Sequence, residues 1–364
     1  MDIVTENRRP AVYGRQDIID MLSIRKEDKA AVEKLKSDAL RMMEERVGTL
    51  VYYRGIVEFS NICMLDCRYC GIRRGNSNVE KRYTLAADDV VGAALWCAEQ
   101  GYGSVVLQSG QRQDESFIGY VENIVRRIKT ESVSDKLPEG LGITLSVGEQ
   151  SLETYARFRE AGAHRYLLRI ESSNPALYAK IHPQEQRFDE RLECLGRLRD
   201  TGYQVGTGVM IGLPGQSIEM LADDILFFRD MDIDMIGMGP YITHPDVPMA
   251  AEGMMDRDDL LQLSLNMIAA ARLALKDVNI AATTALQALV SDGRERGLSY
   301  GANVTMPNLT PKDTRSGYQL YSGKPCVDES REECRGCLLG RVRSTGRDVG
   351  FDMWGDSPHA LAKV

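Results

Sequence analysis

Three cysteines, Cys63, Cys67 and Cys70, form a CxxxCxxC arrangement inside the segment EFSNICMLDCRYCGIRR. Thiols at this spacing on one loop can converge on a metal centre. Zinc would require a fourth ligand, usually Cys or His, and none of the four histidines lies near this loop in the sequence. An iron–sulfur cluster with one iron left open suits three thiolates, although clusters held only by cysteines normally use four.

A second group of cysteines lies close to the C-terminus, where Cys326, Cys334 and Cys337 are spaced CxxxxxxxCxxC. Its loop is longer and less distinctive than the first. The spacing alone is weak evidence for a metal site, and zinc binding and free surface thiols both remain open at this point. Cys97 and Cys194 lie inside amphipathic helical patterns, so we interpret them as small buried hydrophobic residues.

The elements that must position these residues are short apolar runs that alternate with helical stretches from about residue 51 onward. Eight strands are predicted, at residues 53–59, 104–108, 142–147, 165–170, 205–211, 235–238, 280–284 and 303–306. Eight such β-then-α units predict a (β/α)8 TIM-type barrel, whose active site lies at the C-terminal ends of the strands. A doubly wound open sheet is the alternative. It is disfavoured because the cysteine loop, and no GxGxxG turn, follows the first strand.

Hydrophobic spacings of three and four predict helices at 87–99, 152–161 and 188–200. Val32, Leu35, Ala39 and Met42 predict a further amphipathic helix before the first strand. We therefore divide the chain into an N-terminal helical extension (1–50), the barrel (51–310) and a C-terminal extension with the second cysteine group (311–364). The tail after Gly340 is expected either to cap the barrel or to be partly ordered.

The 364 residues carry a net charge of −8, with 45 Lys and Arg against 53 Asp and Glu. This balance, without a basic stripe, argues against nucleic-acid binding and against an anionic-membrane anchor. The chain has no apolar run long enough for a membrane helix, and MDIVTENRRP lacks the apolar core of a signal peptide. We therefore expect a cytoplasmic protein whose cysteines remain reduced.

The CxxxCxxC loop, with Tyr69 before its last cysteine, resembles the signature of the radical S-adenosylmethionine (SAM) superfamily. From Arg54 to Cys337 the chain resembles the HydE family of FeFe-hydrogenase maturases. The segments that carry this likeness are IVEFSNIC, CRYCGIRR, VVLQSG, RYLLRIESSNP, GLPGQS, IGMGPYITHPDVP, ATTA, GANVTMPN and QLYSGKPC. Biotin synthase and methylornithine synthase are more distant relatives.

The resemblance implies a 4Fe-4S cluster on Cys63, Cys67 and Cys70 whose open iron binds SAM, and a second iron–sulfur cluster on the C-terminal cysteines. The SAM-binding residues that it implies are Tyr69, Gln108, Ser146, Glu171 and Arg191. A carboxylate suits the ribose hydroxyls or the ammonium group of SAM, and a guanidinium can bind its carboxylate with two hydrogen bonds. A simple ion pair between Glu171, Arg191 or their neighbours is the alternative.

Alternation along strands three and four can point Thr144 and Arg169 into the barrel, where a buried arginine needs an anionic partner. We predict that Arg169 binds a substrate carboxylate, with Thr144 and Thr284 as further catalytic candidates. His244, which precedes a proline, is interpreted as a turn residue. Gln111 and Arg112 replace an acidic pair that is common in the family after QSG. Gln111 could still form hydrogen bonds there, without a charge.

The implied function is reductive cleavage of SAM to a 5′-deoxyadenosyl radical during assembly of the di-iron centre of a hydrogenase. The implied partners are a small-molecule or iron-complex substrate, a reductant such as a ferredoxin or flavodoxin, and other maturases. The alternatives are a radical SAM mutase or sulfur-inserting enzyme acting on a small amino acid, and a carrier of iron–sulfur clusters or zinc without catalytic activity.

Overall fold

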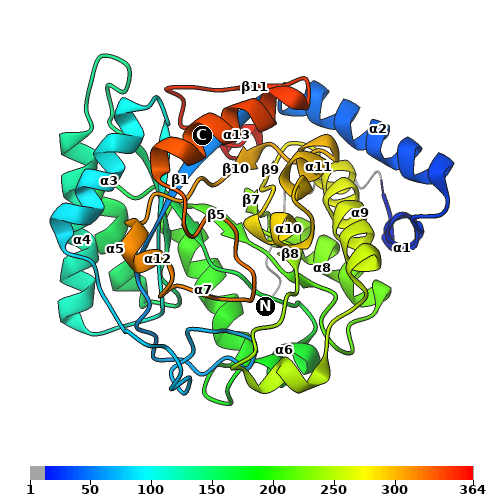
Figure 1. Cartoon of the computed structure of the whole chain (residues 1–364), viewed down its shortest axis with the longest axis horizontal. Helices are drawn as coiled ribbons and strands as arrows, with labels where there is room; N and C mark the ends of the chain where they lie inside the picture. The colour runs from blue at the N-terminus through cyan, green and yellow to red at the C-terminus, as the bar shows by residue number, and fades with distance from the viewer. Residues whose placement is uncertain (1–12, 364) are drawn as a thin grey trace.

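The computed structural model describes residues 13–363. Eight parallel strands follow one another round a ring, with helices on the outside (Figure 1). They are β1 (Leu50–Ser60), β2 (Ser104–Ser109), β3 (Gly142–Ser146), β4 (Arg165–Leu167), β5 (Gln204–Thr207), β7 (Met235–Ile236), β9 (Asn279–Ile280) and β10 (Val304–Thr305). β10 pairs with β1, and a parallel bridge between Ala281 and Val304 joins β9 to β10. The predicted (β/α)8 barrel is confirmed. The interpretation of MDIVTENRRP concerns residues outside the described part.

Most of the predicted strands end earlier than expected, and two of them differ most. The predicted strand 205–211 is divided into β5 and β6 (Met210–Ile211), and β6 pairs with β8 (Gly239–Pro240). At the bend, a Cβ atom on Gly208 would lie 2.0 Å from the carbonyl oxygen of Gly237, so only glycine fits. The predicted strand 280–284 was also wrong at its end, since a helix begins at Thr284.

Amphipathic helices cover the outside of the ring and bury their apolar faces against it. They are α3 (Ala87–Glu99), α4 (Glu115–Glu131), α5 (Leu152–Ala161), α6 (Pro175–Ile181), α7 (Phe188–Asp200), α8 (Ile218–Asp230), α9 (Arg257–Leu275), α10 (Thr284–Leu289) and α11 (Gly293–Ser299). In α4, for example, Phe117, Val121, Ile124 and Ile128 are buried at helical spacing. The bounds predicted for α3, α5 and α7 are confirmed. No helix within 13–363 is both long and apolar enough to cross a membrane.

The N-terminal extension consists of α1 (Arg15–Leu22) and α2 (Lys29–Arg46). α1 packs against α8 and α9, and α2 packs against α9 (Figure 1). Leu35, Ala39 and Met43 are the fully buried positions of α2. The predicted amphipathic helix is therefore present and serves as scaffold outside the ring.

The C-terminal segment closes the floor of the barrel. It contains α12 (Lys312–Arg315), α13 (Arg331–Ser344), β11 (Asp348–Val349) and α14 (Pro358–Leu361), and β11 pairs with the start of β1. The short helix η1 (Pro248–Glu252) lies earlier in the chain, before α9. Arg165 of β4, which is fully buried, donates to the carbonyl oxygen of Trp354 (3.0 Å) and to Asp356 Oδ1 (2.6 Å). The tail after Gly340 was expected either to cap the barrel or to be partly ordered, and the structure shows that it caps the barrel.

The interior of the ring can be followed from side chains that meet across it. Arg54 Nη1 of β1 lies 2.8 Å from Met235 Sδ of β7, although the two strands are not neighbours. Arg54 therefore points inward, and alternation along β1 also points Glu58 inward, nearer the C-terminal end. Strand register places Gln108 beside Glu58 and Ser146 beside Gln108. These three positions form an inward-facing row at the mouth of the barrel.

Candidate active site

The loop that carries Cys63, Cys67 and Cys70 follows β1 at the mouth of the barrel. Backbone hydrogen bonds tie it to its neighbours, from Met64 N to Gln111 O (2.9 Å) and from Arg68 N to Ile181 O (2.9 Å). A Cβ atom on Gly110 would lie 2.7 Å from Cys63 Cβ. Glycine at that position therefore lets the chain after β2 approach the cysteine loop closely.

The three thiols share an apolar environment. Burial raises the pKa of each, that of Cys70 to about 12, and the neighbouring cysteines raise the pKa of Cys67 further. Without a metal the thiols are therefore protonated at neutral pH. Binding of iron must displace these protons, because the thiolate is the ligand.

The donors on this loop fit a cluster with one iron free of protein ligands. Asp66, the carboxylate between the cysteines, is bound by Arg73 and by the backbone amide of Gly75 (2.8 Å). Two imidazoles approach the loop: His182 lies 3.4 Å from the Tyr69 hydroxyl, and His244 lies against Gly71, directly after Cys70. The loop thus offers three sulfur ligands and leaves a fourth position open.

Glu171 lies just beyond β4 in a left-handed conformation, with a φ of 62°. Its backbone amide donates to Gly208 O (2.9 Å), and its carbonyl accepts from Met210 N (3.1 Å), so both neighbours fix this conformation. Burial raises the pKa of Glu171, and the charges of Arg169 and Arg191 oppose that shift. Arg169 Nη2 lies 2.8 Å from Glu171 Oε2. The anion that faces Arg169 in this structure is therefore Glu171.

Arg191 of α7 is buried and pairs with Glu149, the Nε to Oε1 distance being 2.5 Å. Its Nη1 also donates to the carbonyl oxygen of Arg169. Gln111 Oε1 in turn accepts from the backbone amide of Glu149 (2.9 Å). Gln111 thus supports the carboxylate that holds Arg191, and Arg112 pairs with Asp114 (2.9 Å).

The inward row at the mouth combines a buried ion pair with partly exposed polar groups. Lys324, from the loop between α12 and α13, bonds to Glu58 of β1, and both side chains are buried. Asn308 Nδ2 donates to the other oxygen of Glu58 (3.2 Å). Gln108 and Ser146, in the same row, are only partly buried. The barrel is therefore filled at its floor and still accessible at this level.

Thr144 lies nearer the floor than the inward-facing row, whereas Thr284 follows the C-terminal end of β9. The buried Thr144 hydroxyl accepts from Arg165 Nε (3.1 Å), one level nearer the floor. Thr284 is the first residue of α10, and its hydroxyl accepts from Arg294 Nη2 (3.1 Å). Its neighbour Thr283 is buried and has a hydroxyl without a hydrogen-bond partner. The catalytic role of the two predicted threonines stays a prediction.

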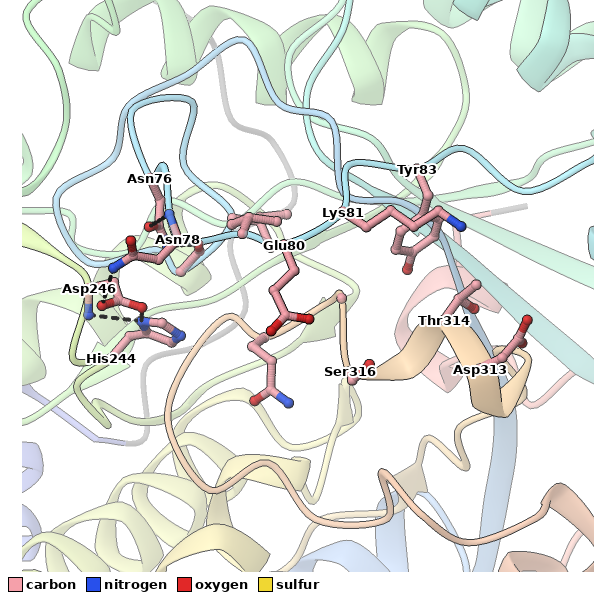
Figure 2. Close-up of a pocket in the computed structure, with 15 residues that line it drawn as sticks. Asn76, Asn78, Glu80, Lys81, Tyr83, His244, Asp246, Asp313, Thr314 and Ser316 are labelled. Carbon is pink, nitrogen blue, oxygen red and sulfur yellow. Dashed lines mark hydrogen bonds and ion pairs between the residues drawn. The ribbon is translucent and has the colours of Figure 1, made fainter.

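A cavity of about 420 Å³ lies beside the cysteine loop (Figure 2). It reaches Gly71 and Ile72, directly after Cys70, and is lined on the other side by Thr314 and Ser316. His244 also lines it, and its Nδ1 accepts from the backbone amide of Asp246 (3.1 Å). This local bond is typical of a turn residue.

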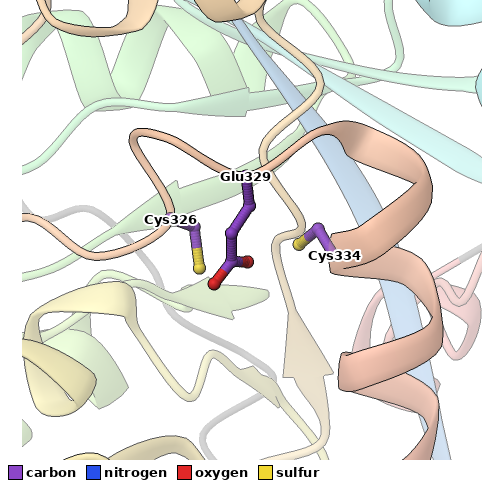
Figure 3. A group of neighbouring side chains, drawn as sticks. All are labelled: Cys326, Glu329 and Cys334. Atoms are coloured by element: carbon purple, nitrogen blue, oxygen red, sulfur yellow. The ribbon is translucent and has the colours of Figure 1, made fainter.

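The second cysteine group is only partly assembled. The sulfurs of Cys326 and Cys334 and a carboxylate oxygen of Glu329 lie within 4.8 Å of one another (Figure 3). A hydrogen bond between the two thiols raises the pKa of Cys326 and lowers that of Cys334. The predicted third ligand, Cys337, is exposed, and Arg341 Nε donates to its sulfur (3.2 Å). Glu329, which sequence analysis missed, takes the third place in this arrangement.

Comparisons with known proteins agree with this site. The family model described as Radical SAM superfamily matches residues 57–228. The [FeFe] hydrogenase maturase subunit HydE of Thermotoga maritima is 42% identical over 353 residues, which is 97% of this chain and 96% of the relative. The chain belongs to the HydE family of radical SAM enzymes. The 3-methylornithine synthase of Methanosarcina barkeri is 28% identical over 84% of this chain and 82% of that protein.

Solved structures agree on the fold of this HydE family member. The crystal structure of methylornithine synthase (PylB) superposes with a TM-score of 0.78 at 23% identity, covering 93% of this chain and 94% of that one. The maturase HydG superposes with a TM-score of 0.74 at 17% identity, covering 92% of this chain and 72% of the HydG chain. Radical SAM enzymes use a 4Fe-4S cluster and SAM, and the three thiols described above fit that cluster.

Proposed function

We propose that this protein is a maturase that cleaves SAM reductively and acts in assembly of the di-iron active-site cluster of an FeFe-hydrogenase. The 42% identity to the Thermotoga maritima maturase, over nearly the full length of both chains, carries this proposal. The cluster, once bound and reduced, supplies the electron that splits SAM into methionine and a 5′-deoxyadenosyl radical.

The residues of this chain have distinct roles in the proposed reaction. Cys63, Cys67 and Cys70 hold the cluster at the mouth. Glu171 and Arg191, both buried and rigidly held, bind SAM through its polar groups together with Tyr69, Gln108 and Ser146. Their fixed positions exclude water and orient the bond to be cleaved, which a reactive primary radical requires.

Arg169 is proposed to bind the carboxylate of the substrate. Its buried Nε atom lacks a hydrogen-bond partner, and its Nη2 atom faces one oxygen of Glu171 at 2.8 Å. An acceptor with two oxygens would satisfy both donors. Thr144, one level deeper, and Thr284 complete the proposed catalytic set.

The proposed partners are an iron-complex or other small substrate, a ferredoxin or flavodoxin as reductant, and other maturases. We also propose a cytoplasmic place of action and a second iron–sulfur cluster at Cys326, Cys334 and Cys337. All eight cysteines are free, which suits a reducing compartment. For the second cluster, Cys337 would have to turn away from Arg341.

The test is maturation of an FeFe-hydrogenase apoenzyme with the partner maturases, SAM and this protein. Hydrogenase activity should appear with the wild type and be absent with Cys67→Ala. Activity that does not depend on this protein would contradict the proposal. A new amino-acid product formed from SAM and a small amino acid would favour the mutase alternative.

A further inference from the structure

The end of α6 and its connection to α7 contact the cysteine loop through several residues. Ile181 O accepts from Arg68 N, His182 faces the Tyr69 hydroxyl, and Gln186 Oε1 accepts from Cys67 Sγ at 3.4 Å. Only the last of these contacts reaches a sulfur that would bind iron. Gln186 therefore differs from its neighbours, which hold the loop through its backbone and through Tyr69.

Gln186 is held firmly in this position. Its side chain is 5% exposed, and its backbone amide donates to Pro183 O (2.9 Å) in a turn before α7. His182, which directly precedes this turn, is itself fixed to α6, because its Nδ1 lies 2.9 Å from Tyr178 O. Since a carbonyl oxygen only accepts, Nδ1 carries the proton, and Nε2 accepts from Tyr69.

The hydrogen bond between Cys67 and Gln186 must reverse when Cys67 binds iron. The thiol donates its proton in the metal-free protein, and that proton leaves to solvent when the thiolate binds. A thiolate sulfur can only accept, so the oxygen of Gln186 would then face it without a proton between them. Rotation about the last side-chain bond exchanges the oxygen and the NH₂ group, and this places a donor on the sulfur.

We propose that Gln186 is a positioning residue for the cluster, which donates an amide hydrogen bond to Cys67 Sγ and thereby raises the reduction potential of the cluster. The inference rests on the cluster of the proposed function. Reduction adds negative charge to the cluster, so a donor on a ligand sulfur stabilises the reduced form more than the oxidised form. At a higher reduction potential, the cluster accepts more readily the electron that cleaves SAM.

The test compares reconstituted wild type with Gln186→Met and Gln186→Leu, two apolar substitutions whose side chains carry no hydrogen-bond donor. Gln262→Met, which removes an amide on the outer helix α9, is the matched control. Iron and sulfide per chain establish that the cluster is intact, and a redox titration followed by electron paramagnetic resonance gives its midpoint potential. Iron content of the wild type tests the cofactor itself, independently of Gln186.

We expect the potential to be lower in Gln186→Met and in Gln186→Leu than in the wild type, with Gln262→Met equal to the wild type. For the Met variant we expect the ratio of reduced to oxidised cluster at a fixed potential to fall by about tenfold, which is about 59 mV for one electron. An intact cluster in Gln186→Met with the wild-type potential would overturn the proposal. If that variant does not retain iron, a Gln186→Leu potential equal to or above that of the wild type overturns it.

Discussion

At the scale of single residues, the site consists of charged groups that are held by other charged groups. Arg191 is held by Glu149 and by the carbonyl of Arg169, and Glu171 pairs with Arg169. An arginine that is fixed in this way loses little side-chain freedom when a ligand binds. The two arginines differ, however, because Arg191 is paired through both Nε and Nη1, whereas the buried Nε of Arg169 has no acceptor.

Arg169→Lys is the substitution that tests the substrate role of this residue. Lysine keeps the charge but cannot form two parallel hydrogen bonds, so turnover of substrate should fall by about 10- to 100-fold, the equivalent of one charged hydrogen bond. Cleavage of SAM without substrate should continue. Product and 5′-deoxyadenosine should be measured on the same preparation, and loss of SAM binding would contradict the assignment.

At the scale of elements, the loop between α12 and α13 spans the mouth from the far side. Gly71 N donates to Leu320 O (3.0 Å), and Ser322 N donates to Thr243 O (3.2 Å). Arg315 holds the carbonyl oxygens of Cys326 (3.1 Å) and Glu329 (2.6 Å). The second cysteine group is therefore attached to the rim, outside the inward-facing row.

The position of this loop predicts that the two cysteine groups are not equivalent. The triple variant Cys326→Ala, Cys334→Ala and Cys337→Ala should lose part of its iron but keep cleavage of SAM. Iron per chain and the yield of 5′-deoxyadenosine are the two measurements. Unchanged iron would show that no second cluster forms, and loss of cleavage in a folded protein would contradict a peripheral role.

The segment that closes the floor depends on one carboxylate. Asp356 accepts from Arg165 (2.6 Å) and lies 3.2 Å from His164 Nε2. Asp356→Ala would leave the buried Arg165 without its counter-charge, so the free energy of unfolding should fall by about 3–5 kcal/mol. Urea denaturation measures this loss. As a control, Asp352→Asn removes the charge of a partly exposed carboxylate of the same segment, whose contact is Lys136 at 3.4 Å; Asn tolerates the left-handed conformation of this residue (φ 57°), so the change should cost about 0–1 kcal/mol.

At the scale of the whole molecule, a histidine at the floor of the barrel makes the free energy of unfolding depend on pH. Burial and the charge of Arg165 lower the pKa of His164 to about 3, whereas an unfolded histidine titrates near 6.5. Between these values the unfolded chain binds the extra proton, so stability falls as the pH falls from 6.5 toward 3. The loss is up to about 1.4 kcal/mol per pH unit for one such histidine.

Urea unfolding at pH 7 and pH 5 should show this loss in the wild type and a smaller one in His164→Asn. The carboxylates contribute in both proteins, so the difference between the two slopes isolates the histidine. Equal slopes would show that folding does not lower the pKa of His164, which would contradict this account.

Much of the fold could be predicted from local sequence patterns, because the spacing of apolar residues in a helix or strand involves only residues that are close in the sequence. The helices 87–99, 152–161 and 188–200 and the starts of most strands are examples. Strand ends were less predictable, since the bends at Gly208 and Glu171 depend on contacts with neighbouring strands. The predicted strand through Thr284 was wrong because a helix begins there.

The candidate site was predictable only where one short segment contains it. The loop that contains Cys63, Cys67 and Cys70 is such a segment. The partners Glu149, Gln186 and Lys324 come from distant parts of the chain, and single polar residues in loops give no signal of the side chain that they meet. Glu329 was missed because the pattern CxxxxxxxCxxC predicted Cys337 as the third ligand.

The central claim is that the loop after β1 holds a cluster that cleaves SAM. The most direct measurement is the yield of 5′-deoxyadenosine after anaerobic reconstitution with iron and sulfide and addition of SAM and a strong reductant. The wild type and the control Cys337→Ala should both form it, and Cys67→Ala should form none. Persistent 5′-deoxyadenosine formation by folded Cys67→Ala would contradict the claim, as would bound iron without any product in the wild type.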